Sequence, residues 1–146
     1  MSSTYSFLDC NAGIVGPGGA FQLGNGAGAA EEGITIAPTG DISGMLIGAD
    51  GSGQHSLHAD KSGTVTIRVL KVSPVNQLLS ALYAFQTSNG ASHGQNTIAI
   101  NDRSRGDAII CTQCAFKKAP DLTYAKEGGT NEWVFNAIRI ERTLGS

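Results

Sequence analysis

Short apolar runs separated by glycine-rich turns dominate this chain. The clearest run is Thr64–Val72, in which Val65, Ile67 and Val69 alternate with polar residues. Alternation with a period of two is typical of a strand that buries one face. Further runs of this kind are Thr4–Asp9, Ala12–Val15, Ala20–Leu23, Gly33–Ala37, Ile42–Gly48, Gln54–Asp60, Asn96–Asn101, Ala108–Lys117, Leu122–Ala125 and Glu132–Glu141. The pattern predicts a mainly β protein, an antiparallel sandwich or barrel.

One helical pattern interrupts the strands. Ser73 is a good N-cap, and Pro74 suits the first helical position. Apolar residues then recur at helical spacing until Ser88–Asn89–Gly90 ends the run. These residues are Val75, Leu78, Leu79, Leu82 and Phe85. We therefore expect one helix, over about 73–87, within a single domain that spans residues 1–146.

The helical segment is free of charge. No Asp, Glu, Lys or Arg occurs from Val72 to Asn101, whereas a surface helix usually carries charge opposite its apolar stripe. A polar face in contact with water is one explanation. The explanation that we favour is a face partly covered by another subunit or by a partner protein.

Charge is scarce and unevenly distributed along the whole chain. Charged residues make up 15% of the sequence, against about 25% in an average soluble domain. All ten Lys and Arg residues lie between Lys61 and Arg142, whereas the first sixty residues contain six acids and no Lys or Arg. One interpretation is head-to-tail self-assembly, in which an acidic face meets a basic face of the next copy. The alternative is that both halves intermingle in the fold.

Membrane and nucleic-acid functions have no support in the sequence. No apolar run approaches the length of about 18 residues that a membrane span needs. The start of the chain lacks the pattern of a signal peptide. Neither half of the chain concentrates Lys and Arg into the basic patch that nucleic-acid binding requires.

The glycines at Gly24, Gly26 and Gly28 raise the question of a nucleotide site. With Ala29 they satisfy the G-x-G-x-x-G/A spacing of dinucleotide folds. That motif needs a following helix, and only a few residues separate it here from the next predicted strand. Two carboxylates, Glu31 and Glu32, would also lie where phosphate binds. We therefore interpret residues 24–33 as a glycine-rich loop that orders where another backbone approaches closely.

Other candidate motifs are equally weak. Gly90–Gly94 matches the G-x-S-x-G nucleophile elbow, but here the helix precedes the motif and a strand follows it. Cys111 and Cys114 have C-x-x-C spacing, and His55 with His58 could complete a zinc site. Residues three apart on a strand point to opposite faces, so packed thiols are the simpler expectation. We predict no catalytic residue, no cofactor and no metal site.

Three long stretches resemble a known protein family. They are "TYSFLDCNAGIVGPGG", "GADGSGQHSLHADKSGTVTIRVLKVSPVNQLL" and "RGDAIICTQCAFKKAPDLTYAKEGGTNEWVFNAIRIERTLG". In this order they resemble the tail tube proteins of contractile-tailed bacteriophages and of phage-derived tail particles. The resemblance covers roughly Tyr5 to Gly145.

This resemblance implies a structural virion protein rather than an enzyme. The expected fold is a β-sandwich or barrel with a helix on one flank. Six copies would form a ring whose inner strands join into a shared barrel, and stacked rings would form the inner tube through which DNA leaves. Such a protein would be made and assembled in the bacterial cytoplasm, would act in the virion tail, and would not insert into membranes.

The resemblance also implies partners. The expected partners are further copies of the chain, the tail sheath, baseplate and tail terminator proteins, and, transiently in the lumen, a tape measure protein and DNA. A neutral or acidic lumen would keep DNA from sticking, since each Lys or Arg that contacts a phosphate adds affinity. Arg68 would be an exception to such a lumen, with its charge held in an ion pair. The candidate self-assembly contacts are Gly24, Gly26, Gly28, Glu31, Glu32, Lys61 and Arg68.

Two alternative functions stay open at this point. A tube-like adaptor or terminator would use the same fold to form one ring and stop. A small ligand-binding domain or enzyme would use the glycine-rich loop or the C-x-x-C segment instead.

Overall fold

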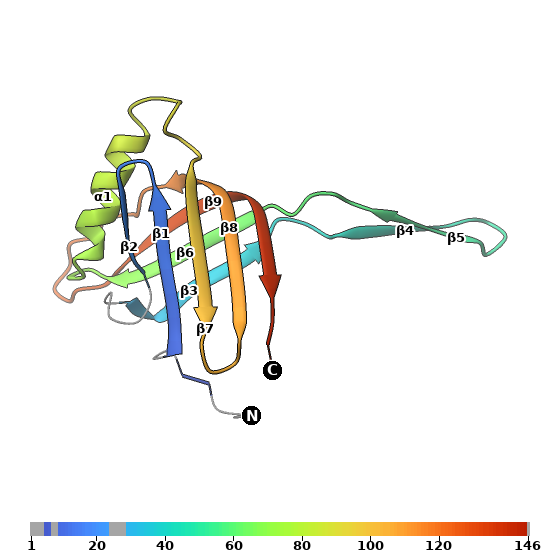
Figure 1. Cartoon of the computed structure of the whole chain (residues 1–146), viewed down its shortest axis with the longest axis horizontal. Helices are drawn as coiled ribbons and strands as arrows, with labels where there is room; N and C mark the ends of the chain where they lie inside the picture. The colour runs from blue at the N-terminus through green and yellow to red at the C-terminus, as the bar shows by residue number, and fades with distance from the viewer. Residues whose placement is uncertain (1–4, 7–8, 24–28, 146) are drawn as a thin grey trace.

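The chain folds into one curved antiparallel sheet, one helix and a projecting hairpin. The computed structural model describes residues 5–6, 9–23 and 29–145. Within them the elements are β1 (Cys10–Gly16), β2 (Gly19–Gln22), β3 (Ala29–Pro38), β4 (Ser43–Ile47), β5 (Gly53–Leu57), β6 (Gly63–Leu70), α1 (Val75–Gln86), β7 (Asn96–Asp102), β8 (Asp107–Lys118) and β9 (Thr130–Thr143). Seven strands form the sheet in the order β2-β1-β7-β8-β9-β6-β3, while β4 and β5 pair only with each other (Figure 1).

The sheet curls so that its two halves enclose one core. Figure 1 shows β1 and β7 running at a steep angle to β3 and β6. Alternate residues of these strands point inward, and buried residues from both halves form a single cluster. The inward residues include Ile14 of β1, Ile98 of β7, and Val65 and Ile67 of β6. This arrangement confirms the predicted β-rich fold with one helix.

Helix α1 packs on this core through one stripe. Val75, Leu79, Leu82 and Gln86 are buried at helical spacing. Aromatic side chains lie beneath the helix, and the ring centroids of Tyr83 and Phe116 are 5.3 Å apart in an edge-to-face contact. Trp133 and Phe135 extend this aromatic group. Packing, rather than capping, therefore holds the helix in place.

The polar pair Gln86–Asn96 joins the helix to the β1–β2 turn. Both side chains are fully buried and exchange two hydrogen bonds of 2.7 Å between their amide groups. Gln86 Nε2 also donates to the carbonyl oxygen of Pro17, at 3.0 Å. A Cβ atom at Gly16 would lie 1.9 Å from Asn96 Oδ1, so only glycine fits beside this pair. Each buried polar atom is thus satisfied, and the turn is fixed against the helix.

A bend in β8 and β9 allows the sheet to curl. Cys111 and Cys114 are both fully buried although they lie three residues apart, so the expectation that they face opposite sides is wrong. Between them Gln113 has a φ of 53°, and two residues of β8, Thr112 and Gln113, lie opposite the single residue Thr97 of β7. This β-bulge reverses the inward alternation of β8. Ala137 and Ile140, their partners on β9, are also both buried.

The structure confirms most predicted elements and corrects four details. The strand expected over Thr4–Asp9 is absent from its described residues, and Leu122–Ala125 lies in a loop. The helix begins at Val75 with Pro74 as its cap, although Ser73 Oγ still accepts a hydrogen bond from the Val75 amide at 3.2 Å. Of the loop expected over 24–33, residues 29–33 belong to β3, which begins at Ala29, and residues 24–28 lie outside the described residues.

The bend predicts opposite effects of two substitutions at Gln113, whose side chain is exposed. Gln113→Gly removes the strain of a left-handed backbone and is expected to raise the free energy of unfolding by up to about 1 kcal/mol. Gln113→Val places a β-branched residue there and is expected to lower it by about 1–3 kcal/mol. Urea denaturation followed by Trp133 fluorescence measures both. Equal effects of the two variants would contradict the strained bend.

Candidate assembly surfaces

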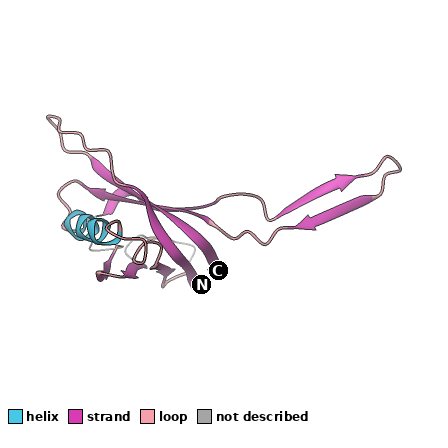
Figure 2. Cartoon of the chain, turned by 90° about the horizontal axis from the view of Figure 1, so that it is seen from above, coloured by secondary structure: helices cyan, strands magenta, loops and turns pink. Residues whose placement is uncertain are grey.

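The hairpin β4–β5 forms an arm that leaves the body of the protein. We call residues 42–58 the arm. The two strands pair from Ser43 with Leu57 to Ile47 with Gly53, and the His58 amide donates to the Ile42 carbonyl at 2.8 Å. Figures 1 and 2 show the arm extending well beyond the sheet, with no other element beside it. Every residue of the arm is exposed except Gly44, which is half-buried.

The arm carries large apolar side chains in spite of this exposure. On one face of the ribbon lie Met45, Ile47 and Leu57, which are 66%, 54% and 84% exposed. Leu46 lies on the other face and is 69% exposed. An isolated two-stranded hairpin is marginally stable in water, and a contiguous exposed apolar group marks an interaction site. The arm is therefore a candidate assembly surface.

A tight turn closes the tip of the arm. The Asp50 carboxylate accepts hydrogen bonds from the Ser52 amide at 3.0 Å and from Ser52 Oγ at 2.5 Å. These bonds favour the ionised form, so they lower the pKa of Asp50. Gly51 supplies a φ of +91°, which a side chain would disfavour. The tip is therefore well defined and carries a negative charge at neutral pH.

Two basic residues singled out from the sequence lie in ion pairs. Arg68 on β6 reaches Glu132 on β9, with 3.4 Å between Arg68 Nε and Glu132 Oε2. Arg68 Nη1 also donates to Thr35 Oγ1 at 2.7 Å. Lys61, at the base of the arm, lies 3.6 Å from the Glu141 carboxylate. The structure thus supports the expectation that the charge of Arg68 is paired.

The structure describes only some of the other predicted contact residues. Gly24, Gly26 and Gly28 lie outside the described residues. Glu31 and Glu32 belong to β3, in the part where its pairing with β6 is irregular, between Ala29 and Ile34. They are therefore strand residues rather than members of a free loop, at an edge of the sheet. Their role in assembly stays a prediction.

The residues of the hypothetical zinc site are not brought together. His55 and His58 are exposed on the arm, whereas Cys111 and Cys114 are buried in the sheet. Burial raises the pKa of Cys111 to about 11 and that of Cys114 to about 12, so both thiols stay protonated and are poor metal ligands. Among the described residues no three potential metal ligands form a group.

The outward face of α1 is uncharged, as expected from the sequence. Leu78 and Phe85 are 46% and 51% exposed, and Ala81 is exposed between them. One polar residue of this helix has a structural role instead: Asn76 Oδ1 accepts a hydrogen bond of 3.1 Å from Trp133 Nε1. Gln77 and Ser80 are exposed as well, so the outward face is an uncharged, partly apolar surface that is separate from the arm.

Comparison with known proteins identifies the family. A family model described as "Bacteriophage PhiTE tail tube protein" matches residues 1–145. The chain belongs to this tail tube family. No curated protein matches its sequence. Tail tube proteins are structural components of phage and phage-like tails, so the role of this tail tube protein is structural.

Solved structures support the fold. The tail tube protein is similar to the chain in "Cryo-EM Structure of an Extracellular Contractile Injection System, PVC sheath-tube complex in extended state", with a TM-score of 0.59, 10% identity and coverage of 97% and 93% of the two chains. The chain is also similar to a tube-terminating cap of the anti-feeding prophage, with a TM-score of 0.56 and 10% identity. That match covers 99% of this chain and 95% of the cap chain. A third similar structure is a PVC sheath/tube terminator, with a TM-score of 0.54 and 10% identity. That match covers 97% of this chain and 98% of the terminator chain. At this identity the likeness concerns the fold.

Membrane insertion is not indicated by the helix of the tail tube protein. In the described part of the chain, no helix has the length and apolar character needed to span a membrane.

The sequence pattern predicted both strands of the arm but not that they pair only with each other, apart from the sheet. The run Met45–Ile47 is apolar at every position, which is also typical of a strand buried on both faces. Two signals could have identified it: the short glycine-rich connection from Gly48 to Gly53, and the polar composition of the paired strand.

The edge position of Glu31 and Glu32 generates a prediction. Replacing both with Lys is expected to impair pairing or stacking of subunits, because it reverses two charges at a sheet edge, while the monomer stays folded. Electron microscopy of assemblies and circular dichroism of the monomer measure the two effects. Loss of the monomer spectrum would instead place both side chains in the domain's own structure.

Proposed function

We propose that this tail tube protein assembles into hexameric rings that stack into a hollow tube. The observation that carries the proposal is the arm, with its uncovered Met45, Ile47 and Leu57. Burying one such side chain contributes about 1.5–3 kcal/mol. A contact made by an arm of one copy with the body of another is heterologous, and heterologous contacts propagate into rings or filaments.

Free sheet edges support ring closure. The sheet ends in β2 on one side and in β3 on the other. Unpaired edges of this kind are usually covered or joined to another strand. Joining the β3 edge of one copy to the β2 edge of the next would give a continuous barrel around the ring.

The proposed tube is a conduit for DNA, and the charges of the chain fit this role. Lys and Arg side chains in a lumen would bind phosphates and slow the passage of DNA. Arg68 is neutralised by Glu132, and the first sixty residues contain only acidic charges. We infer a lumen that is neutral or acidic overall.

Helix α1 is the surface that we assign to an outer partner. Its uncharged outward face, with Leu78 and Phe85, suits a sheath protein or a neighbouring subunit. One similar structure is a sheath–tube complex, and others come from tube terminators and a baseplate. By analogy we propose sheath, terminator and baseplate proteins as partners, a tape measure protein transiently in the lumen, and assembly in the bacterial cytoplasm.

A single-ring adaptor or terminator is the second candidate function. The observation in its favour is that tube-terminating proteins have the same fold as this chain, at TM-scores of 0.56 and 0.54. Both functions need ring-forming contacts, but only a tube protein also needs contacts between rings.

Electron microscopy of the purified protein over a concentration series separates these functions. Because the arm of every copy needs a covering partner, we expect hollow, regularly striated tubes above a threshold concentration, in the absence of sheath. Single rings at all concentrations would favour the adaptor. Monomers at all concentrations would contradict both.

A triple variant tests the arm as the assembly element. Met45→Ser, Ile47→Ser and Leu57→Ser together are expected to abolish tubes while shifting the melting temperature little, since these side chains contact little within their own chain. Leu122→Ser is a matched control, because Leu122 is 60% exposed but lies outside the arm. Tubes formed normally by the triple variant would exclude the arm from assembly.

The conduit proposal predicts weak affinity of the tube for DNA. Assembled tubes mixed with short duplex DNA are expected to sediment without it at physiological salt, because a lumen that is neutral or acidic overall offers few cations to the phosphates. Co-sedimentation that falls steeply with salt would show phosphate contacts and would contradict a neutral or acidic lumen.

A further inference from the structure

One face of the sheet carries no charge over β1, β7 and β8. Side chains alternate between the two sides of a strand, so the residues between the buried ones point away from the core and from α1. Gly13, Ala99 and Ile110 lie in register on the three strands, and Asn11, Asn101 and Ala108 form the next row. A shallow hollow of about 380 Å³ lies over them, and no charged residue lines it. We call these two rows the uncharged face.

Charges begin on the neighbouring strand, β9. Glu141 lies in register with Ile110, and Arg139 with Thr112. Arg139 Nε lies 2.5 Å from Glu141 Oε1, and Lys61 Nζ lies 3.6 Å from the same oxygen. The hydrogen bond from Arg139 is the main cause that lowers the pKa of Glu141, so the carboxylate is ionised at neutral pH. One carboxylate therefore holds two cations at the border of the uncharged face.

The charges around the root of the arm balance each other. A cavity of about 550 Å³ lies there, between the arm and β9. Three carboxylates and three cations line it or lie in ion pairs at its edge. They are Asp41, Asp60 and Glu141 on one side and Lys61, Arg139 and Arg142 on the other. Opposite charges this close largely cancel each other's field beyond a Debye length, which is about 8 Å in physiological salt.

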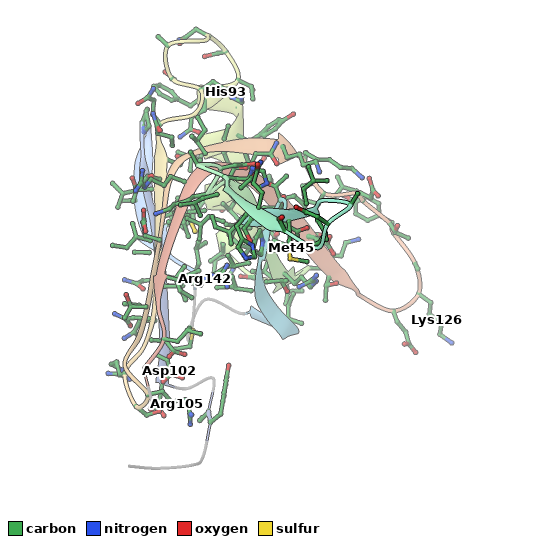
Figure 3. All side chains as sticks on the ribbon, turned by 90° about the vertical axis from the view of Figure 1, so that its right-hand side faces the viewer. Met45, His93, Asp102, Arg105, Lys126 and Arg142 are labelled. Atoms are coloured by element: carbon green, nitrogen blue, oxygen red, sulfur yellow. The ribbon has the colours of Figure 1, made fainter. Side chains whose placement is uncertain are left out.

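The charges at the lower end of the sheet balance as well. The β7–β8 turn follows the uncharged face and carries Asp102, Arg103, Arg105 and Asp107. Figure 3 shows Asp102 and Arg105 close together at this end of the sheet. Two carboxylates and two guanidinium groups add no net charge, so neither border of the uncharged face has an excess of cations.

The side of the sheet on which this face lies determines what it meets in a tube. Helix α1 is assigned to the outside of the proposed tube, and the uncharged face lies on the other side of the core. It therefore turns toward the lumen. Duplex DNA carries one negative charge per about 1.7 Å of its axis, and each phosphate that meets a Lys or Arg adds affinity. A face without free cations gives DNA no such contact.

We propose that the uncharged face lines the lumen of the tube and that Glu141 withholds Lys61 and Arg139 from the phosphates of passing DNA. This inference rests on the proposed tube and names the part of the chain that meets DNA. It attributes free passage to the absence of unpaired cations rather than to repulsion by an acidic wall.

Adding one cation to the uncharged face tests its position. Tubes of Ala99→Lys are assembled with short duplex DNA, treated with nuclease and sedimented. We expect at least about tenfold more nuclease-protected DNA than with unmodified tubes, released by salt. Gln77→Lys adds the same charge to the outward face of α1, and its bound DNA is expected to be digested. Ala99→Gln controls for the larger side chain and is expected to retain no DNA.

Removing one carboxylate tests the role of Glu141. Glu141→Gln keeps the shape of the side chain but leaves Lys61 and Arg139 without their shared partner, so its tubes are expected to protect at least about tenfold more DNA than unmodified tubes. Glu132→Gln, beside Arg68, changes the net charge equally outside the uncharged face and is the matched control. Because this variant adds no bulk, it tests the inference even if Lys at position 99 prevents assembly.

Electron microscopy of the same samples separates this inference from the proposed function. Tubes of Glu141→Gln that protect no more DNA than those of Glu132→Gln would overturn the role of Glu141. Tubes of Gln77→Lys that protect more DNA than those of Ala99→Lys would overturn the position of the uncharged face. Both results would leave the tube standing. Absence of tubes from the unmodified protein would overturn the proposed function and this inference together.

Discussion

The apolar arm is the constraint around which this tail tube protein is organised. Met45, Ile47 and Leu57 project from a two-stranded ribbon that lies beside no other element of its own chain. Water disfavours such a surface, and a hairpin of this size has little stability alone. An isolated copy therefore exposes apolar side chains to water. Burying them against a neighbouring copy would be favourable. We infer that this exposed apolar surface drives assembly, so that the tendency to assemble is already present in the fold of the single chain.

The body of the protein provides a rigid base for this arm. The bend at Gln113 keeps Cys111, Cys114, Ala137 and Ile140 all inside, so one sheet can enclose a core with both of its halves. The Gln86–Asn96 pair then fixes the β1–β2 turn against α1. Because the core is complete without the arm, assembly and folding are separable. The outer faces of the sheet and of the helix stay available for contacts between proteins.

Much of this fold could be predicted from local sequence patterns. The alternation in Thr64–Val72 and the helical spacing after Pro74 identified β6 and α1, and the long family-like stretches identified a tail tube protein. The bend at Gln113 could not be predicted, because it depends on two paired strands reversing their alternation together.

The candidate site was predicted less well, for a related reason. Charge counts pointed to an acidic first part of the chain, and three of its acids, Asp41, Asp50 and Asp60, do lie on or beside the arm. The apolar run Met45–Ile47 is also typical of a buried strand, and only the glycine-rich connection and the polar composition of the paired strand indicated otherwise. Only the topology shows that β4 and β5 lie apart from the sheet.

Hydrogen exchange at the backbone amides of the arm tests the central claim most directly. The account predicts that amides of β4 and β5 exchange rapidly in the unassembled protein and become strongly protected on assembly, while β6 and β9 are protected in both states. An arm that exchanges equally fast before and after assembly would contradict the claim that a neighbouring copy covers it.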